Sequence, residues 1–461
     1  MRLWILVVPR ALVLATIVLS ALAGAQSQNL TRVDTPEEES AMGADSAPPG
    51  NWRKILPQNR ANPAEGLSEE EIEALDAIGY LGGYEEGPEK IGVTIYDPKG
   101  AYNGYNLYIA GHAYEASLVD MNGQVVHTWQ YDISSHYNVP PERRYWRRVQ
   151  LLPDGGLLAL CERAIPGGGI IRLDKDSNLL WSSELEYGLH HDLFVTGDGT
   201  IYALGKSFKK IPSLHETLSI IDDIVIVLDS EGHLLDRYSI LEAFKKSPFA
   251  EDMLGKIAAF FHKIDTTSGV SEAFHTNTIE VLDGTLAHRS PYLKKNNILG
   301  CSPTHHNAWI IDGETHEVVW NWFGPWRNIH EFTMLDSGNF LMFHNYGYNG
   351  PNGQVSQAIE YDFLSKEEVW KYQGDPERPE SEFRSWTSST VERLPNGNTL
   401  IVVSESGRAI EVTPGGDVVW EFFNPHRAGD EKQFIATLFQ LLRVGPEYDL
   451  SWLNDPSAAL K

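Results

Sequence analysis

Three histidines share one position within a repeated sequence unit. His330 and His191 each lie eight residues before the glycine of a turn, and His275 lies nine residues before one. Apolar residues alternate on both sides of each turn, which predicts β-hairpins. Two more such units place Arg147 and Ser389 eight residues before their turn glycines. Five hairpins therefore present a residue at one equivalent point, and three of these residues are histidines.

Converging imidazoles can perform two kinds of chemistry. Neutral rings on rigid strands make a good transition-metal site. Alternatively, one imidazole attacks as a nucleophile and carries an anionic group covalently, while its neighbours supply hydrogen bonds and a proton for the leaving oxygen. A metal site favours carboxylates that orient the second ring nitrogens. Asp192 and Glu331 directly follow their histidines, but on a strand they point to the opposite face, which favours group transfer.

The segment from Gly92 to Phe423 predicts the elements that position these residues. It consists of strand-like runs and turns, and each unit ends in a strand that carries an aromatic residue. These aromatic residues are Trp129, Trp181, Tyr238, Trp320, Trp370 and Trp420, the last three of them 50 residues apart. A repeated four-stranded unit of this size is typical of a β-propeller. We expect an all-β fold with six blades.

In a propeller the first strand of every blade lines the central axis. Residues at one equivalent point on these strands therefore meet around one end of the axis, so we expect Arg147, His191, His275, His330 and Ser389 to converge there. Further candidate substrate-binding residues are Asn277, which shares a strand face with His275, and His305, His306 and Asn307 of the HHNAW segment. The other histidines are interpreted as ordinary core or surface residues: His112, His127, His136, His215, His233, His262, His288, His316, His344 and His426.

The composition limits the partners. The 461 residues are 42% hydrophobic and 11% aromatic, which is enough for a substantial core. The formal charge of −26 argues against nucleic acid and against anionic membrane surfaces. An anionic substrate meets repulsion at long range, so its attraction must be local and sheltered from solvent.

The N-terminus has the pattern of an export signal. Arg2 and Arg10 precede the apolar run ALVLATIVLSALA, and small residues predict cleavage before Gln26. We therefore expect a signal peptide over residues 1–25 and a periplasmic or extracellular protein, with an uncleaved anchor as the alternative. In an exported protein Cys161 and Cys301 could pair, or both could remain buried free thiols.

The remaining segments divide the chain as follows. Residues 26–91 read as a linker with a short helix over 67–84, and 92–424 as the propeller. Within the propeller, residues 239–272 carry helix-spaced apolar residues and predict a helical insertion. Residues 425–461 read as a helical tail, with an amphipathic helix over 433–444.

The three repeat units that contain His191, His275 and His330 resemble a known family, the bacterial arylsulfate sulfotransferases. HHDLFVTGDG, FHTNTIEVLDG and IHEFTMLDSGNFLMFHNYG look like the histidine-containing strands of that family, and the likeness covers roughly residues 92–424. The resemblance implies an exported six-bladed propeller that moves sulfate from an aryl sulfate to a phenol without a nucleotide donor or other cofactor. It implies that His330 is transiently sulfated. It also implies that His191 and His275 bind the sulfuryl oxygens or shuttle the proton, with Asn277 as a hydrogen-bond donor.

One position departs from the family pattern. Thr304 stands where the family has an arginine, so the bidentate oxyanion clamp is missing there. His305, His306, Arg147 or Arg289 could replace it; otherwise the substrate differs or the activity is lost. We expect a nucleotide-independent aryl sulfotransferase with no metal. The alternatives are a metal-dependent enzyme that uses the same histidines as ligands and a non-catalytic ligand-binding propeller. The oligomeric state is left open.

Overall fold

The structure of this chain is a computed structural model. The described residues are 50–54, 89–135, 139, 143–162, 169–183, 185–263, 270–350, 353–374, 381, 383–429, 432 and 434–454. The expected signal peptide over 1–25 and the expected helix over 67–84 lie outside these ranges. Within them, no helix is long and apolar enough to cross a membrane.

Six antiparallel sheets form the blades. Blade 1 contains β29 (Leu438–Val444), β3 (Tyr105–Ala110), β4 (Glu115–Asp120) and β5 (Val125–Gln130). Blade 2 contains β6 (Arg148–Leu151), β7 (Leu157–Cys161), β8 (Gly169–Leu173) and β9 (Leu179–Ser182). Blade 3 contains β10 (Gly188–Val195), β11 (Ile201–Lys210), β12 (Ser219–Leu228) and β13 (Leu234–Ser239).

Blade 4 contains β15 (Thr278–Val281), β16 (Ile298–Ser302), β17 (Asn307–Ile311) and β18 (Val318–Phe323). Blade 5 contains β19 (Ile329–Met334), β20 (Asn339–Gly350), β21 (Gly353–Asp362) and β22 (Glu368–Tyr372). Blade 6 contains β23 (Thr390–Arg393), β24 (Thr399–Val403), β25 (Arg408–Val412) and β26 (Val418–Phe423), with β2 (Gly92–Tyr96) added outside β26. A small sheet is formed by β1 (Trp52–Lys54), β27 (Arg427–Ala428) and β28 (Phe434–Ala436).

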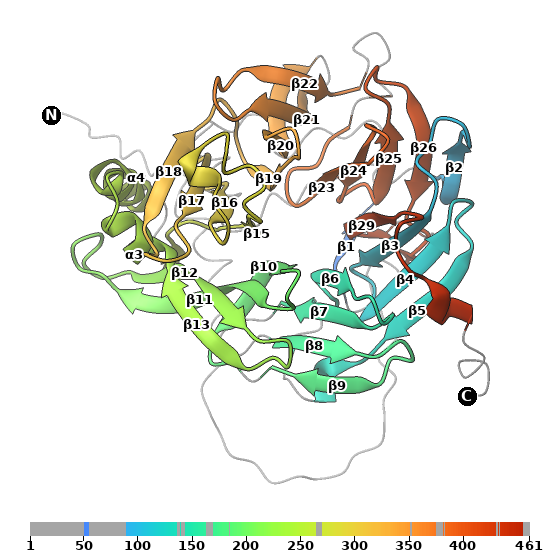
Figure 1. Cartoon of the computed structure of the whole chain (residues 1–461), viewed down its shortest axis with the longest axis horizontal. Coiled ribbons are helices and arrows are strands. Elements are labelled where there is room, and N and C mark those ends of the chain that lie inside the picture. The colour runs from blue at the N-terminus through green and yellow to red at the C-terminus, as the bar shows by residue number, and fades with distance from the viewer. Residues whose placement is uncertain are drawn as a thin grey trace, which may run out of the picture. The chain divides into compact units, whose positions relative to one another are not determined.

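The blades surround a common axis, and the first strand of each faces it (Figure 1). The prediction of a six-bladed propeller is therefore confirmed. Each of the six repeated aromatic residues lies on the fourth strand of its own blade, counted from the axis, as the sequence pattern indicates. The glycines of the five hairpin turns all have positive φ, for example 77° at Gly338, which explains why the turns require glycine. Cys161 and Cys301 are buried free thiols.

The ring is closed by strands from both ends of the chain. β29, near the C-terminus, pairs with β3 as the inner strand of blade 1, and β2 pairs with β26 of blade 6. The predicted amphipathic helix over 433–444 is therefore wrong: the described part of this segment forms β28 and β29. The reason is that β29 is covered on both faces, so its side chains are apolar almost throughout. Apolar content alone does not separate such a strand from a buried helix. The helical structure seen farther on is one 3-10 turn, η5 (Ser451–Asn454).

The predicted helical insertion is present. It contains α3 (Ile240–Lys245), which Ser239 caps, and α4 (Ala250–Lys263), and it ends in β14 (Val270–Glu272). The helices pack apolar side chains such as Ile257 and Phe261 into the core between blades 3 and 4. In Figure 1 they lie at the periphery of the ring rather than over its axis. β14 pairs in parallel with the start of β12, the third strand of blade 3, before the chain continues to β15 of blade 4.

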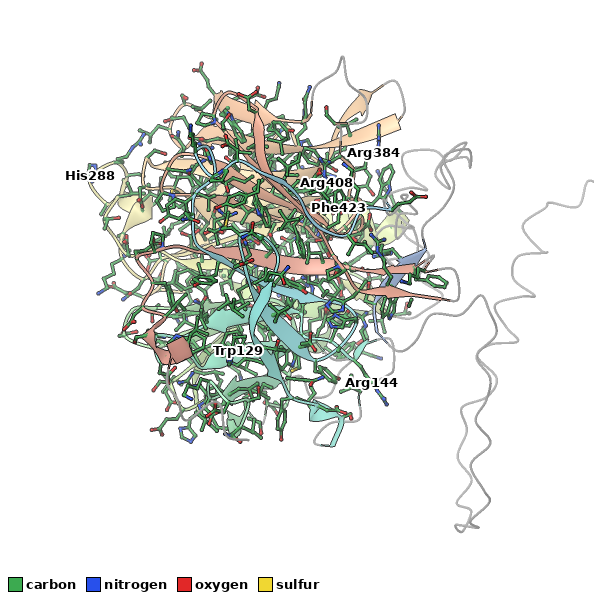
Figure 2. The ribbon with its side chains drawn as sticks, turned by 90° about the vertical axis from the view of Figure 1, so that its right-hand side faces the viewer. Trp129, Arg144, His288, Arg384, Arg408 and Phe423 are labelled. Atoms are coloured by element: carbon green, nitrogen blue, oxygen red, sulfur yellow. The ribbon has the colours of Figure 1, made fainter. Side chains whose placement is uncertain are left out.

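The two faces of the propeller carry different loops. Arg144 and Arg384 precede the inner strands β6 and β23, whereas His288 lies in the connection from β15 to β16. Figure 2 shows Arg144 and Arg384 on the side of the molecule opposite to His288. We call the face at which the inner strands begin the histidine face, because His191, His275 and His330 lie at or near those strand starts.

Candidate active site

The inner strands of blades 3 and 5 are irregular where they carry histidines. The pairing register shifts between Leu189 and Leu193 in β10 and between His330 and Phe332 in β19. His191 has a φ of 56° within the first irregularity. Bulges of this kind re-aim side chains and are common beside active sites. The shared spacing therefore marks positions where the strands bend, rather than simple strand alternation.

The structure brings the three predicted histidines together. The rings of His191 and His275 are in edge contact, with centroids 4.8 Å apart. His330 is close enough to His275 and to Arg147 for both charges to act on it. Arg147 and His275 likewise act on His191. The predicted convergence at the histidine face is thus present in the geometry.

His330 is held in one tautomer by Asn345. The Asn345 amide nitrogen donates to the carbonyl oxygens of Ser385 (2.7 Å) and Ser388 (3.1 Å), so its oxygen faces His330. That oxygen lies 2.8 Å from His330 Nδ1 and can only accept, which assigns the proton to Nδ1. Burial, together with the charges of Arg147 and His275, lowers the pKa of His330 to about 3. The ring is therefore neutral, with an unprotonated Nε2.

His275 has the opposite character. Burial lowers its pKa, but the carboxylate of Glu272 pairs with its Nδ1 and the net effect raises the pKa of His275. Glu272 also pairs with Lys206 from β11. The His275 side chain remains 32% exposed, so its Nε2 can meet a substrate and solvent. One histidine is thus a neutral base and its neighbour a proton donor, which is the pairing that acid–base chemistry requires.

His191 is the third ring of the site. Burial and the positive charges of Arg147 and His275 keep the pKa of His191 well below its ordinary value, so the ring is neutral. Its Nδ1 lies 2.9 Å from Nδ1 of His190, so one of the two nitrogens donates to the other. A neutral imidazole that accepts at Nδ1 presents an N–H at Nε2.

Arg147 takes the inward position, and Arg148 binds elsewhere. The Arg147 guanidinium is buried, lies 3.6 Å from Glu162 and stacks over Phe439 at 4.9 Å. Arg148 bridges Asp192 at 2.7 Å and Glu331 at 2.8 Å. Asp192 and Glu331, the carboxylates that directly follow His191 and His330, are thus bound to Arg148. This agrees with the prediction that they do not orient the imidazole rings.

Two of the other sequence candidates have structural partners. The Nδ2 of Asn277 donates to the carbonyl of Ile329 at 2.7 Å and so ties blade 4 to the residue before His330. Ser389 exchanges two hydrogen bonds with Ser404, at 2.8 and 3.1 Å. Both residues therefore position the inner strands beside the histidines.

The HHNAW segment lies outside the three-histidine group. His305 contacts the carbonyl of Ala273 at 2.6 Å and packs edge-on against aromatic rings. Asn307 donates to Asn321 at 2.7 Å within the outer half of blade 4. His306 accepts from the backbone N–H of Asn328 at 3.3 Å, two residues before His330. Their expected contact with substrate stays a prediction.

The expected replacements for the missing arginine lie in different parts of the propeller. Thr304 lies in the turn between β16 and β17. Arg289 binds the Ser337 carbonyl and Asp362 in the turns of the opposite face. Arg147 is the replacement candidate whose charge acts on both His191 and His330.

The sequence interpretation missed several side chains of the site, among them Glu272, Lys206, Asp223 and His190. Glu272 and Lys206 come from β14 and β11, and Asp223 accepts from the backbone N–H of Thr276. His190 could have been suspected from the His190–His191 doublet. Glu272 lies three residues before His275, but only the parallel pairing of β14 with β12 explains its position.

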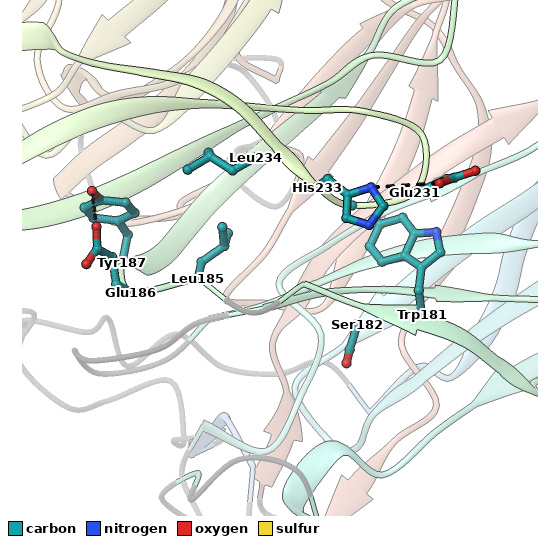
Figure 3. A pocket seen from close by; sticks show the side chains of 9 residues that line it. Trp181, Ser182, Leu185, Glu186, Tyr187, Glu231, His233 and Leu234 are labelled. Carbon is teal, nitrogen blue, oxygen red and sulfur yellow. Dashed lines mark hydrogen bonds and ion pairs between the residues drawn. The ribbon is translucent and has the colours of Figure 1, made fainter.

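A separate hollow of about 570 Å³ lies far out on the blades. Figure 3 shows its lining side chains, among them Trp181, Tyr187 and His233. They come from β9, β13 and the connections next to them. None of the three central histidines lines this hollow, so it is not part of the candidate active site.

Comparison with known proteins identifies the family. The family described as "Arylsulfotransferase (ASST)" matches residues 148–425, which is more than half of the chain. No curated protein matches.

Similar solved structures are distant. A protein of unknown function from Bacteroides caccae has 11% identity and a TM-score of 0.46, covering 74% of this chain and 98% of its own. The WD40 propeller domain of Doa1 has 13% identity and a TM-score of 0.39, with coverage of 77% and 93%. The β-propeller domain of Cps50 (Swd1) from Myceliophteria thermophila has 13% identity and a TM-score of 0.41, with coverage of 76% and 96%. By the match over residues 148–425, the chain belongs to the arylsulfotransferase family.

Proposed function

We propose that this protein transfers a sulfuryl group from an aryl sulfate to a phenol through a sulfated His330, without a nucleotide donor. Family membership supports arylsulfotransferase activity in general. The observation that carries the specific mechanism is the hydrogen bond from His330 Nδ1 to Asn345, which leaves Nε2 with a free electron pair. We also propose, from the apolar N-terminal run, that the protein acts outside the cytoplasm.

The first half-reaction forms the covalent intermediate. His330 Nε2 attacks sulfur, a nitrogen–sulfur bond forms and the bond from sulfur to the aryl oxygen breaks. The electron pair leaves with the aryl oxygen, which takes a proton from His275 Nε2 and departs as a phenol. The Asn345 oxygen accepts from Nδ1–H and stabilises the positive charge that the His330 ring acquires.

The second half-reaction reverses these roles. The acceptor phenol gives its proton to the now neutral His275, and its oxygen attacks sulfur. The nitrogen–sulfur bond breaks, and its electron pair returns to His330 Nε2. Arg147 and an N–H from His191 supply donors for the oxygens of the sulfuryl group as charge develops on them. The net reaction converts an aryl sulfate and a phenol into a phenol and a new aryl sulfate.

The decisive experiment looks for the intermediate. Mixing the protein with 4-nitrophenyl sulfate in the absence of an acceptor should give an adduct of about 80 Da on a peptide that contains His330. The sample should be analysed without acid, because N-sulfated imidazole is acid-labile. His330→Ala and His330→Asn should form no adduct and show no turnover, with melting temperatures near that of the wild type.

His316→Ala is the matched control. His316 stacks on Tyr238 at 4.0 Å in an outer strand region, away from the site. This variant should form the adduct and turn over normally. Normal turnover by His330→Ala, or an adduct that maps to another residue, would contradict the proposed nucleophile.

A further inference from the structure

A second cluster of histidine and carboxylate side chains lies where the first and last blades meet. His112 lies in the turn between β3 and β4, Glu115 begins β4, and His426 follows the end of β26. The turn is on the histidine face, because Ala110 at the end of β3 pairs with Leu438 at the start of β29. This cluster is separate from the three central histidines.

The three side chains offer closely spaced ligand atoms. One atom from each lies within 4.8 Å of the other two. Nε2 of His112 lies 3.4 Å from a carboxylate oxygen of Glu115. The rings of His112 and His426 stack with centroids 3.4 Å apart and planes 10° apart. The hydroxyl of Tyr108 lies 3.3 Å from Nε2 of His426.

His112 lacks the hydrogen bonds that a buried imidazole normally has. Both of its ring nitrogens are shielded from solvent; Nδ1 has no hydrogen-bond partner among the described residues, and the polar group beside Nε2 is the Glu115 carboxylate, 3.4 Å away in poor hydrogen-bond geometry. A buried polar atom without a partner is costly and calls for an explanation, such as an ion that completes its environment. By contrast, His127 is also partly buried but lies 2.8 Å from the carbonyl of Lys175.

We propose that His112, Glu115 and His426 bind one divalent transition-metal ion, of the Zn²⁺ class, that joins blade 1 to blade 6. Two imidazoles and one carboxylate are a ligand set that Zn²⁺ accepts, with a fourth position left for water. Ca²⁺ and Mg²⁺ prefer oxygen ligands, so a site with two nitrogens disfavours them. Among the described residues, His112, Glu115 and His426 form the group of histidine and acidic side chains whose ligand atoms are close enough together to hold one metal ion.

The backbone holds the ligands at the closure of the ring. Gly111 N–H donates to the Thr437 carbonyl at 2.8 Å, and Ala436 N–H donates to the His426 carbonyl at 3.1 Å. Both ligand-bearing loops are thus attached to the segment that leads into β29. A metal would connect residues that are more than 300 positions apart in the chain. Because the site exists only when the blades are assembled, metal binding stabilises the folded ring.

The experiment uses the full chain treated with EDTA, dialysed and then titrated with Zn²⁺ alone. We expect one ion per chain by elemental analysis, with a dissociation constant in the micromolar range or below. At saturation the melting temperature should rise by about 2–5 °C. Co²⁺ bound in place of Zn²⁺ should give the intense visible absorption of a four-coordinate site rather than the weak absorption of the six-coordinate hydrated ion.

Three variants test the assignment. Glu115→Gln keeps the volume of the side chain, and His112→Asn and His426→Asn remove the imidazoles. Each should lower the affinity for Zn²⁺ at least tenfold and abolish the rise in melting temperature. His233→Asn is the matched control, because His233 lies beside two carboxylates, 3.0 and 3.9 Å away, on the surface.

The outcomes separate this site from the central one. His191→Asn combined with His275→Asn should leave Zn²⁺ binding unchanged. If that double variant removes the metal, or if Glu115→Gln binds as tightly as the wild type, the proposal is wrong. A chain that binds no stoichiometric metal also overturns it, without bearing on sulfuryl transfer at His330.

Discussion

Replacing Glu272 by glutamine tests whether His275 is the proton donor. Burial and the charge of Lys206 lower the pKa of His275, whereas the Glu272 carboxylate raises it and determines the net direction. Glutamine preserves the size of the side chain but removes the negative charge. The pKa of His275 should therefore fall, and each unit below the assay pH reduces the protonated fraction about tenfold.

The size of the effect depends on the leaving group. General acid catalysis contributes about 10²–10⁴ in rate where the leaving oxygen needs a proton. Phenyl sulfate has a basic leaving group, so Glu272→Gln should lower its kcat by about 10²–10³. 4-Nitrophenol leaves readily without a proton, so the same variant should lower the kcat for 4-nitrophenyl sulfate by about tenfold or less.

The pH dependence provides a second readout. In the wild type the acid form of His275 is lost as the pH rises through its raised pKa, so the rate with phenyl sulfate should fall on the alkaline side. In Glu272→Gln this fall should move to lower pH. On the acidic side, protonation of His330 becomes limiting only near its pKa of about 3.

Initial rates for both donors across the pH range measure these effects. Glu231→Gln is the control, because Glu231 is an exposed carboxylate on the outer connection near His233. An equal loss of rate for the two donors, with an unchanged alkaline limb, would refute the acid role. Glu272 would then act only by holding Lys206 in place.

Two further predictions concern Arg147 and the closure of the ring. Arg147→Lys keeps the charge but loses the planar fork, so kcat/KM should fall by about 10–10³, whereas Arg289→Lys on the opposite face should have little effect; equal losses would remove Arg147 from the site. Leu441→Ala in the buried strand β29 should cost about 2–5 kcal/mol in the free energy of unfolding measured with urea. Leu364→Ala, at a side chain that is 58% exposed, should change it little, and a similar cost for both would show that β29 is not a core strand.

The repeated features of the fold could be predicted from the sequence because they are local. An aromatic residue such as Trp320 or Trp370 marks the outer strand of each blade, and a glycine marks each hairpin turn. The closure of the ring could not be predicted in this way. β29 leaves no local signal of its pairing partner, because β3 lies more than 300 residues earlier in the chain. Its mostly apolar side chains, interrupted by Gln440 and Arg443, suit a buried helix equally well.

In the candidate site, too, the residues that belong to the repeat could be predicted and the others could not. His191, His275 and His330 could be found because they repeat with the turns. The residues that set their protonation could not be found in this way. Glu272 reaches His275 through β14, at the end of an insertion that belongs to no repeat. Asn345 determines the tautomer of His330 only because Ser385 and Ser388 fix the orientation of its amide.

The charges around the histidines explain how a strongly acidic chain can bind an anion. Arg147, Lys206 and, in its acid form, His275 are cations of the site, but Glu162 and Glu272 lie against them. The net charge of the group is therefore small, and a general positive field is not what attracts a sulfate ester. What remains is a set of donors in fixed directions, sheltered from water, where each hydrogen bond is stronger than in solvent. Such a site favours an anion most when charge shifts onto its oxygens, which in the proposed mechanism is during transfer of the sulfuryl group rather than during binding.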